Sequence, residues 1–438
     1  AMVSATTGGN TYNLAIGNYA MQYFTAGATG NGQNTIIGNN AGKGSSGNTT
    51  GEFNTALGYN ALNALTSGGS NVAIGRGAAA LLTTGGTNTI IGRDAGDALT
   101  GTGDTVLIGY AAGGAINSTD ANGTVAIGRQ AGLALTEGQY NVLLGYQAGK
   151  TITTSDRNVA IGYEALRDLS ATGAQKNIVI GWKAGLGGSG DMSDNVAIGD
   201  NAMDGTGTLD AFANVFIGRD AGGGTWATAA SHYNIGIGNY VMDAAMNGAL
   251  YNTAIGYNAA SALTTGDQNV ILGAGAGYSL TTGQYNTIVG VDAANMHTDV
   301  NDVVAVGWQA GKNIGADGTI AIGMKAMYEH TTGVRNIAIG YQAMQGTNAG
   351  STSLGSSDNI FMGYNAAAGT WTDAATNGNV GIGSYVMDAA CDGALYNTAV
   401  GAYALSAVTQ ADNVVAIGNS AAYSLTTASN NLAIGFSA

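Results

Sequence analysis

The chain has no proline in its 438 residues. Proline cannot donate a backbone hydrogen bond, so its absence is expected where strands pair on both sides. A single cysteine cannot form an internal disulfide, which excludes a disulfide-stapled domain. No run of about 18 apolar residues is present, and we therefore expect no membrane insertion.

Charged residues are also scarce, at 9% of the chain against roughly 25% in ordinary soluble domains. The formal net charge of −14 opposes binding to phosphate backbones, so we expect no nucleic-acid partner. The first residues lack the basic and apolar segments of a secretion signal, and we expect the chain to be a segment of a longer protein.

The chain is rich in glycine, with 74 residues, and in one short motif that recurs 24 times. The motif reads Asn, a β-branched residue, a small or aliphatic residue, Ile, Gly, two variable residues and Ala, and its first copy begins at Asn13. Positions below are counted from the motif glycine, which is position 0. Successive glycines lie 16 to 23 residues apart, most often 17. A unit this short cannot bury its own apolar face, so successive repeats must stack.

Positions −3, −2 and −1 are typical of a β-strand, because they are aliphatic or β-branched in most copies. Side chains alternate along a strand, so −3 and −1 share one face and −2 takes the other. We expect −3 and −1 to fill the interior of each turn and −2 to form an outward apolar stripe. That stripe would contain Ala15, Ile36, Ala56, Ala73, Ile90, Leu107 and their successors.

The pattern predicts an all-β fold, a parallel β-roll or β-solenoid of about 24 rungs, where one rung is one turn of the coil. We expect a single continuous repeat domain over residues 1–438, with residues 1–12 as a lead-in. A 145-residue super-repeat relates residues 214–268 to residues 359–412. Handedness is left open.

Position −4 is asparagine in 19 of 24 repeats, and position 0 is always glycine. Stacked asparagines can form a hydrogen-bonded amide ladder, and glycine suits a corner with positive φ or close backbone contact. The predicted structural ladder includes Asn34, Asn54, Asn141, Asn269, Gly38, Gly58, Gly145 and Gly273.

An outward apolar stripe along the whole chain would exceed the few hundred Å² that soluble monomers usually expose. A closed homotrimer would bury it with one repeated interface. We therefore predict a parallel homotrimer, and the alternative is a monomeric solenoid with a tolerated apolar face.

The repeat resembles known proteins, most clearly in Asn252 to Asn269, which reads Asn-Thr-Ala-Ile-Gly-Tyr-Asn-Ala-Ala-Ser-Ala-Leu-Thr-Thr-Gly-Asp-Gln-Asn. Its core resembles the head repeats of trimeric autotransporter adhesins, and the longer form is similar to repeats of bacteriophage tail fibres. The resemblance implies a trimeric β-roll that serves surface attachment, outside the cell or on the virion. Adhesin heads are usually built on shorter repeats, which favours the tail fibre.

We expect no enzyme, cofactor or metal site. There is no Ser-His-Asp pattern, phosphate-binding loop or dinucleotide fingerprint. Cys391 replaces Met246 of the sister block and is interpreted as an apolar filler. His297 and His330 both fall at position +7, otherwise a leucine column, and only three copies of one histidine around a threefold axis could hold an ion. The acidic groups are interpreted as solvated loop residues and are Asp191, Asp194, Asp200, Asp292, Asp299 and Asp302.

Aromatic residues are the candidates for binding a host-surface glycan or protein receptor, because exposed rings with a polar tip suit both. Many occupy position +1, and others lie in enlarged repeats. The candidate contacts are Trp182, Trp308, Tyr163 and Tyr341 at position +1 and Trp226 and Trp371 in the enlarged repeats. The longest interval, which contains Gln345 to Ser357, is a further candidate loop. The predicted function is a non-enzymatic tail-fibre segment; the alternatives are an adhesin head and, less favoured, an ice-binding solenoid.

Overall fold

The computed structural model describes residues 12–24, 32–45, 49–330, 332–346, 355–371 and 374–438, and within them it contains strands, turns and loops but no helix. The fold is a parallel β-solenoid of about 24 rungs with a period of about 17 residues, which confirms the predicted fold class. The predicted lead-in lies outside the described residues except for Tyr12.

The chain divides into two compact units, Ala1–Asp220 with Thr225–Ala227, and Ala221–Gly224 with Thr228–Ala438. The single continuous domain stays a prediction. The main strands of the first unit are β1 (Leu14–Ile16), β2 (Thr35–Ile37), β3 (Thr55–Leu57), β4 (Val72–Ile74), β5 (Thr89–Ile91), β6 (Val106–Ile108), β7 (Val125–Ile127), β8 (Val142–Leu144), β9 (Val159–Ile161), β10 (Ile178–Ile180), β12 (Val196–Ile198) and β14 (Val215–Ile217). A second, short parallel pair consists of β11 (Met192–Ser193) and β13 (Ala211–Phe212).

The second unit continues the same pattern. Its strands are β15 (Ile235–Ile237), β16 (Thr253–Ile255), β17 (Val270–Leu272), β18 (Thr287–Val289), β19 (Val304–Val306), β20 (Ile320–Ile322), β21 (Ile337–Ile339), β22 (Ile360–Met362), β23 (Val380–Ile382), β24 (Thr398–Val400), β25 (Val415–Ile417) and β26 (Leu432–Ile434).

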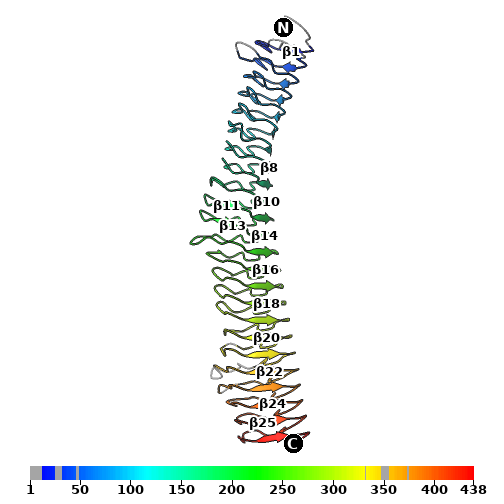
Figure 1. The fold of residues 1–438 in the computed structure, drawn as a ribbon, viewed down its shortest axis with the longest axis vertical. Helices are drawn as coiled ribbons and strands as arrows, with labels where there is room; N and C mark the ends of the chain where they lie inside the picture. The colour runs from blue at the N-terminus through cyan, green and yellow to red at the C-terminus, as the bar shows by residue number, and fades with distance from the viewer. Residues whose placement is uncertain (1–11, 25–31, 46–48, 331, 347–354, 372–373) are drawn as a thin grey trace. The chain divides into compact units, whose positions relative to one another are not determined.

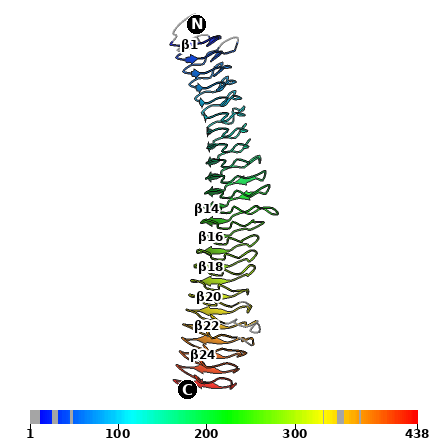
Figure 2. The same ribbon diagram turned by 180° about the vertical axis from the view of Figure 1, so that it is seen from behind.

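Within each unit, every main strand pairs in parallel with the strand one rung later, and equivalent residues face each other. Val142 of β8 pairs with Val125 of β7 and with Val159 of β9. The strands therefore stack on one side of each unit and the loops on the other, as both views show (Figures 1 and 2). Each motif position consequently becomes a column of side chains along the unit.

The predicted orientation of the strand side chains is wrong. Position −2 points inward: five of the six stripe residues named above are at most 1% exposed, and Ala15 in the first strand is half-buried. Positions −3 and −1 point outward and are half-buried or exposed in every main strand. The physical reason is the buried asparagine at −4, which shares the inward face with −2 because side chains alternate.

Three columns fill the interior. The −2 side chains meet the small residue at +3, such as Ala148, and the aliphatic residue at +7, such as Leu135, both of which are fully buried. Positions +3 and +7 therefore face the interior together with −2. A small +3 residue leaves room for the larger +7 side chain across a narrow coil.

The position-0 glycine forms the corner after each strand, with φ between 133° and 147° throughout. This backbone conformation disfavours L side chains. A Cβ on Gly145 would also overlap the carbonyl oxygen of Gly162 on the next rung. Both predicted reasons for glycine, positive φ and close backbone contact, therefore hold.

The asparagine ladder is present. Asn54 Oδ1 accepts hydrogen bonds from the backbone N–H and from Nδ2 of Asn71, both at 3.0 Å. Asn71 Oδ1 does the same for Asn88, at 3.1 and 2.9 Å. The second Nδ2 hydrogen of each asparagine reaches a loop carbonyl, as from Asn71 to Gly85 at 3.0 Å. Buried amides thus stay satisfied while they tie each strand to its loop and to its neighbours.

Candidate binding surfaces

The outward face of the strands is an apolar surface that runs along each unit. Each rung places two side chains there, most of them Val, Ile, Leu or Thr. The aliphatic side chains most exposed on this face are Leu14, Ile16, Leu57, Leu144, Ile178, Ile235, Ile255, Val270, Ile382, Ile417, Leu432 and Ile434. Twelve strands at a spacing of ~4.8 Å make this face about 58 Å long in each unit. The face is apolar, regular and uncovered within one chain.

The +1 column lies just past the glycine corner, and its side chains are exposed or half-buried. Trp182 is 45% exposed, and Trp308, Tyr163 and Tyr341 are exposed as well. The rings stack from rung to rung: Tyr146 and Tyr163 lie 5.1 Å apart at 6°, and Tyr163 and Trp182 lie 6.3 Å apart at 14°. Stacking uses the ring faces, so these rings present mainly their edges and polar tips to solvent.

Cations interleave with the rings of this column. The Arg93 guanidinium lies 4.3 Å from the Tyr110 ring centre, and Arg129 lies between Tyr110 and Tyr146, at 5.8 and 5.6 Å. Lys183 Nζ lies 4.5 Å from Trp182, and Lys325 Nζ lies 5.1 Å from Trp308. Cation–π contacts at exposed sites are worth about 0.5–1 kcal/mol each. The column is therefore an ordered surface of rings and cations.

Trp226 and Trp371 are not exposed receptor contacts, and that prediction is wrong. Their exposures are 2% and 0%. The Trp371 ring packs edge-on against Phe361 at 6.0 Å, and a Cβ at Gly381 would lie 2.5 Å from the same Phe361 ring. The enlarged repeat thus widens the coil interior and fills it with an indole. Within the candidate loop Gln345 to Ser357 of the longest interval, residues 347–354 lie outside the described residues.

The two histidines of the +7 column differ in burial, and His297 is half-buried. His330 is fully buried, and its Nε2 lies 2.8 Å from the Gly333 carbonyl oxygen and 3.0 Å from Asn336 Nδ2. Burial lowers the pKa of both His330 and His297. In the part of the chain that the structure describes, no three His, Cys, Asp or Glu residues are grouped as a metal site.

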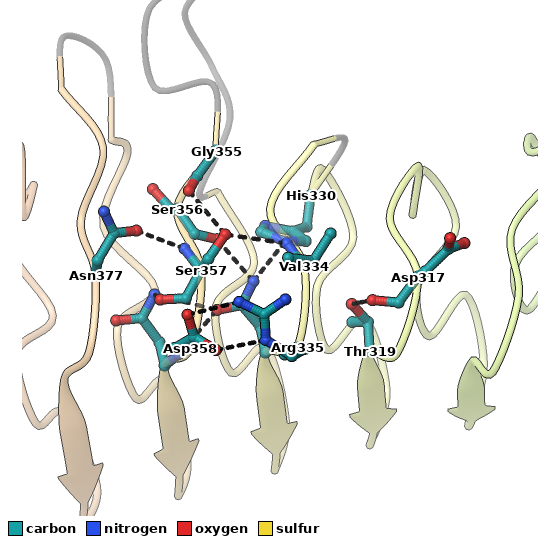
Figure 3. A network of polar contacts seen from close by, with 12 residues as sticks. Asp317, Thr319, His330, Val334, Arg335, Gly355, Ser356, Ser357, Asp358 and Asn377 are labelled. Atoms are coloured by element: carbon teal, nitrogen blue, oxygen red, sulfur yellow. Dashed lines mark hydrogen bonds and ion pairs between the residues drawn. The ribbon is translucent and has the colours of Figure 1, made fainter.

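Polar side chains around this region cap the loops instead (Figure 3). Arg335 donates to both carboxylate oxygens of Asp358, at 2.7 and 2.9 Å, on the exposed surface. At position −6, the Ser357 N–H donates to Asn377 Oδ1 at 2.7 Å, and the Val334 N–H donates to Ser357 Oγ at 3.2 Å. Each rung thereby caps a backbone donor of the preceding one, a role that satisfies loop amides.

The acidic groups show mainly structural roles. Asp191 accepts a hydrogen bond from Ser193 Oγ at 3.1 Å, and Asp194 lies 3.8 Å from Lys176 Nζ. Sequence reasoning missed Asp204, whose pKa is raised to about 6 by burial and by the nearby Asp220 carboxylate. Cys391 is fully buried, and burial raises the pKa of its thiol, as expected of an apolar filler.

A small hollow that the sequence did not predict opens on three successive rungs, those of Gly58, Gly75 and Gly92. Its volume is about 240 Å³. The lining residues are Tyr59, Asn60, Arg76, Gly77, Ala80, Leu81, Asp94 and Asp97. The available signal was glycine at position +2, which occurs only at Gly77 and Gly275 among the 24 repeats.

Comparison with known proteins gives no relative: no family model matches the chain, and no curated protein matches it. Among the described residues there is no helix with the length and apolar character needed to cross a membrane.

Proposed function

We propose that this chain is a structural segment of a fibrous attachment protein, a phage tail fibre, that works as a parallel homotrimer on the virion surface. The observation that carries the proposal is the outward strand face, where two side chains per rung, mostly aliphatic, remain uncovered along each unit. A single chain in water would leave about 58 Å of this face exposed in each unit.

The surface that best covers this outward face is the same face on two further copies of the chain. Every rung presents the same apolar pair at the same height, so parallel copies match each other rung by rung. A closed ring of three buries all three faces with one repeated contact and leaves no open end for further growth. The other columns, including the rings at +1, then stay available at the surface.

The proposed work of the assembly is mechanical reach combined with weak, repeated contact to a host-surface glycan or protein. Repetition across three chains raises the overall affinity through effective concentration, without a single strong site. Duplication of the 145-residue block lengthens such a fibre while it keeps every column in register. The head of a bacterial trimeric adhesin remains the second candidate, because the same stacked repeat serves it equally well.

The test is attachment of the fluorescently labelled full chain to a panel of bacterial cells. We expect saturable binding to susceptible strains that Tyr163→Ala or Trp308→Ala weakens. Periodate treatment of the cells removes a glycan receptor and protease treatment removes a protein receptor. No saturable binding to any strain, together with release of reducing ends from a surface polysaccharide, would instead identify an enzyme.

A further inference from the structure

The hollow described above exists because one side chain is absent from the +2 column. Twenty-two of the 24 repeats carry a side chain there, whereas Gly77 has none. A Cβ at Gly77 would lie 2.8 Å from Asp94 Oδ1 on the next rung, so the space is bounded closely by that carboxylate. Gly275 is the matched case: its Cβ would lie 2.7 Å from Asp292 Oδ1, but Asn295 Nδ2 lies there as well, donating to the Gly275 carbonyl at 2.8 Å.

Two groups in the lining of the hollow lack a partner of their own. Among the described residues, Arg76 has neither the carboxylate partner of Arg93 nor the ring partners of Arg129. Tyr59 is 49% exposed and stacks on no other ring in the described parts of the chain. A free cation and a free ring face therefore line one site.

The polar residues of the lining indicate what charge a bound molecule would carry. Asp94 and Asp97 supply acceptors, and Arg76 is the cation in the lining. Arg93 pairs with Asp94 at 3.3 Å, so two guanidiniums balance the two carboxylates and the charge of the site favours neither an anion nor a cation. The site therefore favours a neutral molecule that carries several hydroxyl groups, since neighbouring hydroxyls pair well with carboxylates.

The apolar residues of the lining and the volume of the hollow indicate what kind of molecule would fit. Leu81, which is 54% exposed, and the Tyr59 ring add apolar groups to the polar lining of the hollow. A pyranose ring suits such a mixed lining, because it carries C–H groups on its faces and hydroxyls at its rim. A volume of about 240 Å³ is below the roughly 300–1,000 Å³ of sites for drug-sized ligands, which suits one sugar ring.

We infer that the hollow lined by Tyr59, Asn60, Arg76 and Asp94 binds a single uncharged hexopyranose unit. The inference deepens the proposed attachment function, on which it rests, by naming a glycan as the receptor class. In the complex, the sugar lies against Tyr59, Arg76 donates to a ring or hydroxyl oxygen, and sugar hydroxyls donate to Asp94 and Asp97. Three chains would present three such sites, each weak alone.

The test is saturation-transfer NMR on the full chain with the methyl glycosides of glucose, mannose and galactose, and with methyl glucuronide as the anionic comparison. We expect saturation transfer to at least one neutral glycoside and none to the glucuronide. Gly77→Asn fills the hollow with a residue that tolerates positive φ and should weaken binding about tenfold or more through loss of two hydrogen bonds. Gly275→Asn makes the same change at the matched position and should leave binding unchanged.

Equal denaturation midpoints of the two variants would establish that both fold alike. The inference is overturned if no neutral glycoside receives saturation transfer, if Gly77→Asn binds as the parent does, or if the glucuronide binds better. The failure of this inference can be distinguished from failure of the proposed function. If cells bind the parent and Gly77→Asn equally, the attachment function stands and this site is ruled out as the receptor site. Saturation transfer without attachment to any cell would leave the sugar site and remove the proposed function.

Discussion

At the scale of single residues, the position-0 glycine is the feature on which the coil depends most. Its φ of 133–147° recurs on every rung, and the carbonyl of the next rung occupies the place where a Cβ would go. Sequence recurrence alone was sufficient to predict this corner, because no other residue combines positive φ with such close backbone approach.

Gly145→Ala should therefore destabilise strongly. We expect a loss of 3 kcal/mol or more, since about 1–3 kcal/mol of backbone strain is joined by a clash with Gly162. Gly173→Ala is the control, because Gly173 also has positive φ, at 104°, but nothing lies within 4 Å of its Cβ position. Denaturant midpoints measure both, and equal losses would show that the clash contributes nothing.

His330 should make the fold sensitive to acid. Burial lowers its pKa in the folded chain, so on acidification the unfolded state takes up the proton first, near pH 6.5. The free energy of unfolding is then highest above about pH 6.5, and it decreases as the pH falls toward the pKa of His330 in the folded chain. His330→Leu restores the usual +7 residue, and we expect a smaller shift of the denaturation midpoint between pH 7.5 and 5. An undiminished shift would contradict this role.

At the scale of the element, the three-residue strand was easy to locate and hard to orient. All three positions are apolar, so hydrophobic alternation does not distinguish the two faces. The −4 asparagine would have oriented the strand. A stacked amide must lie inside the coil, where water does not compete for its hydrogen bonds. Because side chains alternate along a strand, −2 lies on the same face as −4 and must also point inward. The predicted −2 stripe, with side chains such as Ile36, therefore lies inside the coil, and the apolar face that the structure exposes is made of −3 and −1 instead.

The ladder itself should be costly to interrupt. Asn141 Nδ2 donates to the Ser155 carbonyl at 2.8 Å, and its Oδ1 accepts from the Asn158 backbone N–H at 3.0 Å. Asn141→Ala leaves both partners buried and unpaired, and we expect a loss of about 2–5 kcal/mol in the free energy of unfolding. Asn39→Ala on the exposed surface should change it by less than about 0.5 kcal/mol. Similar values for the two variants would contradict the ladder's role.

The enlarged repeats show why the sequence-based interpretation placed the two tryptophans wrongly. Insertions usually form surface loops, but here Trp371 packs inside, against Phe361, where Gly381 leaves space. The same trio recurs 145 residues earlier as Phe216, Trp226 and Gly236, and a large and a vacant −2 residue on successive repeats was the visible sign of this packing.

Trp371→Ala should consequently act on stability and not on surface binding. Removing a fully buried indole costs about 3–5 kcal/mol, which a denaturation curve measures. Cell attachment of the folded variant should equal that of the parent. Weaker attachment at unchanged stability would restore the receptor-contact role.

At the scale of the whole molecule, the account depends on what covers the outward strand face. The sequence predicted an apolar surface too large for a monomer, and the structure replaces a stripe made largely of alanine with side chains such as Val72 and Ile74, which are larger. Larger aliphatic side chains bury more apolar area when chains associate, and each Å² buried contributes roughly 25 cal/mol to the free energy of association. The ring stacking and cation contacts of the +1 column could not be foreseen, because solvent-facing columns are under little packing constraint.

The most direct measurement of this central claim is the mass of the chain by sedimentation equilibrium over a dilution series. We predict three times 43.3 kDa at micromolar concentration, and a shift to lower mass for Ile74→Asp combined with Ile108→Asp, which place charges on the outward face. Asp substitutions at the exposed Tyr257 and Tyr403 are the control and should leave the mass unchanged. A folded chain that sediments at 43.3 kDa at every concentration would contradict the account.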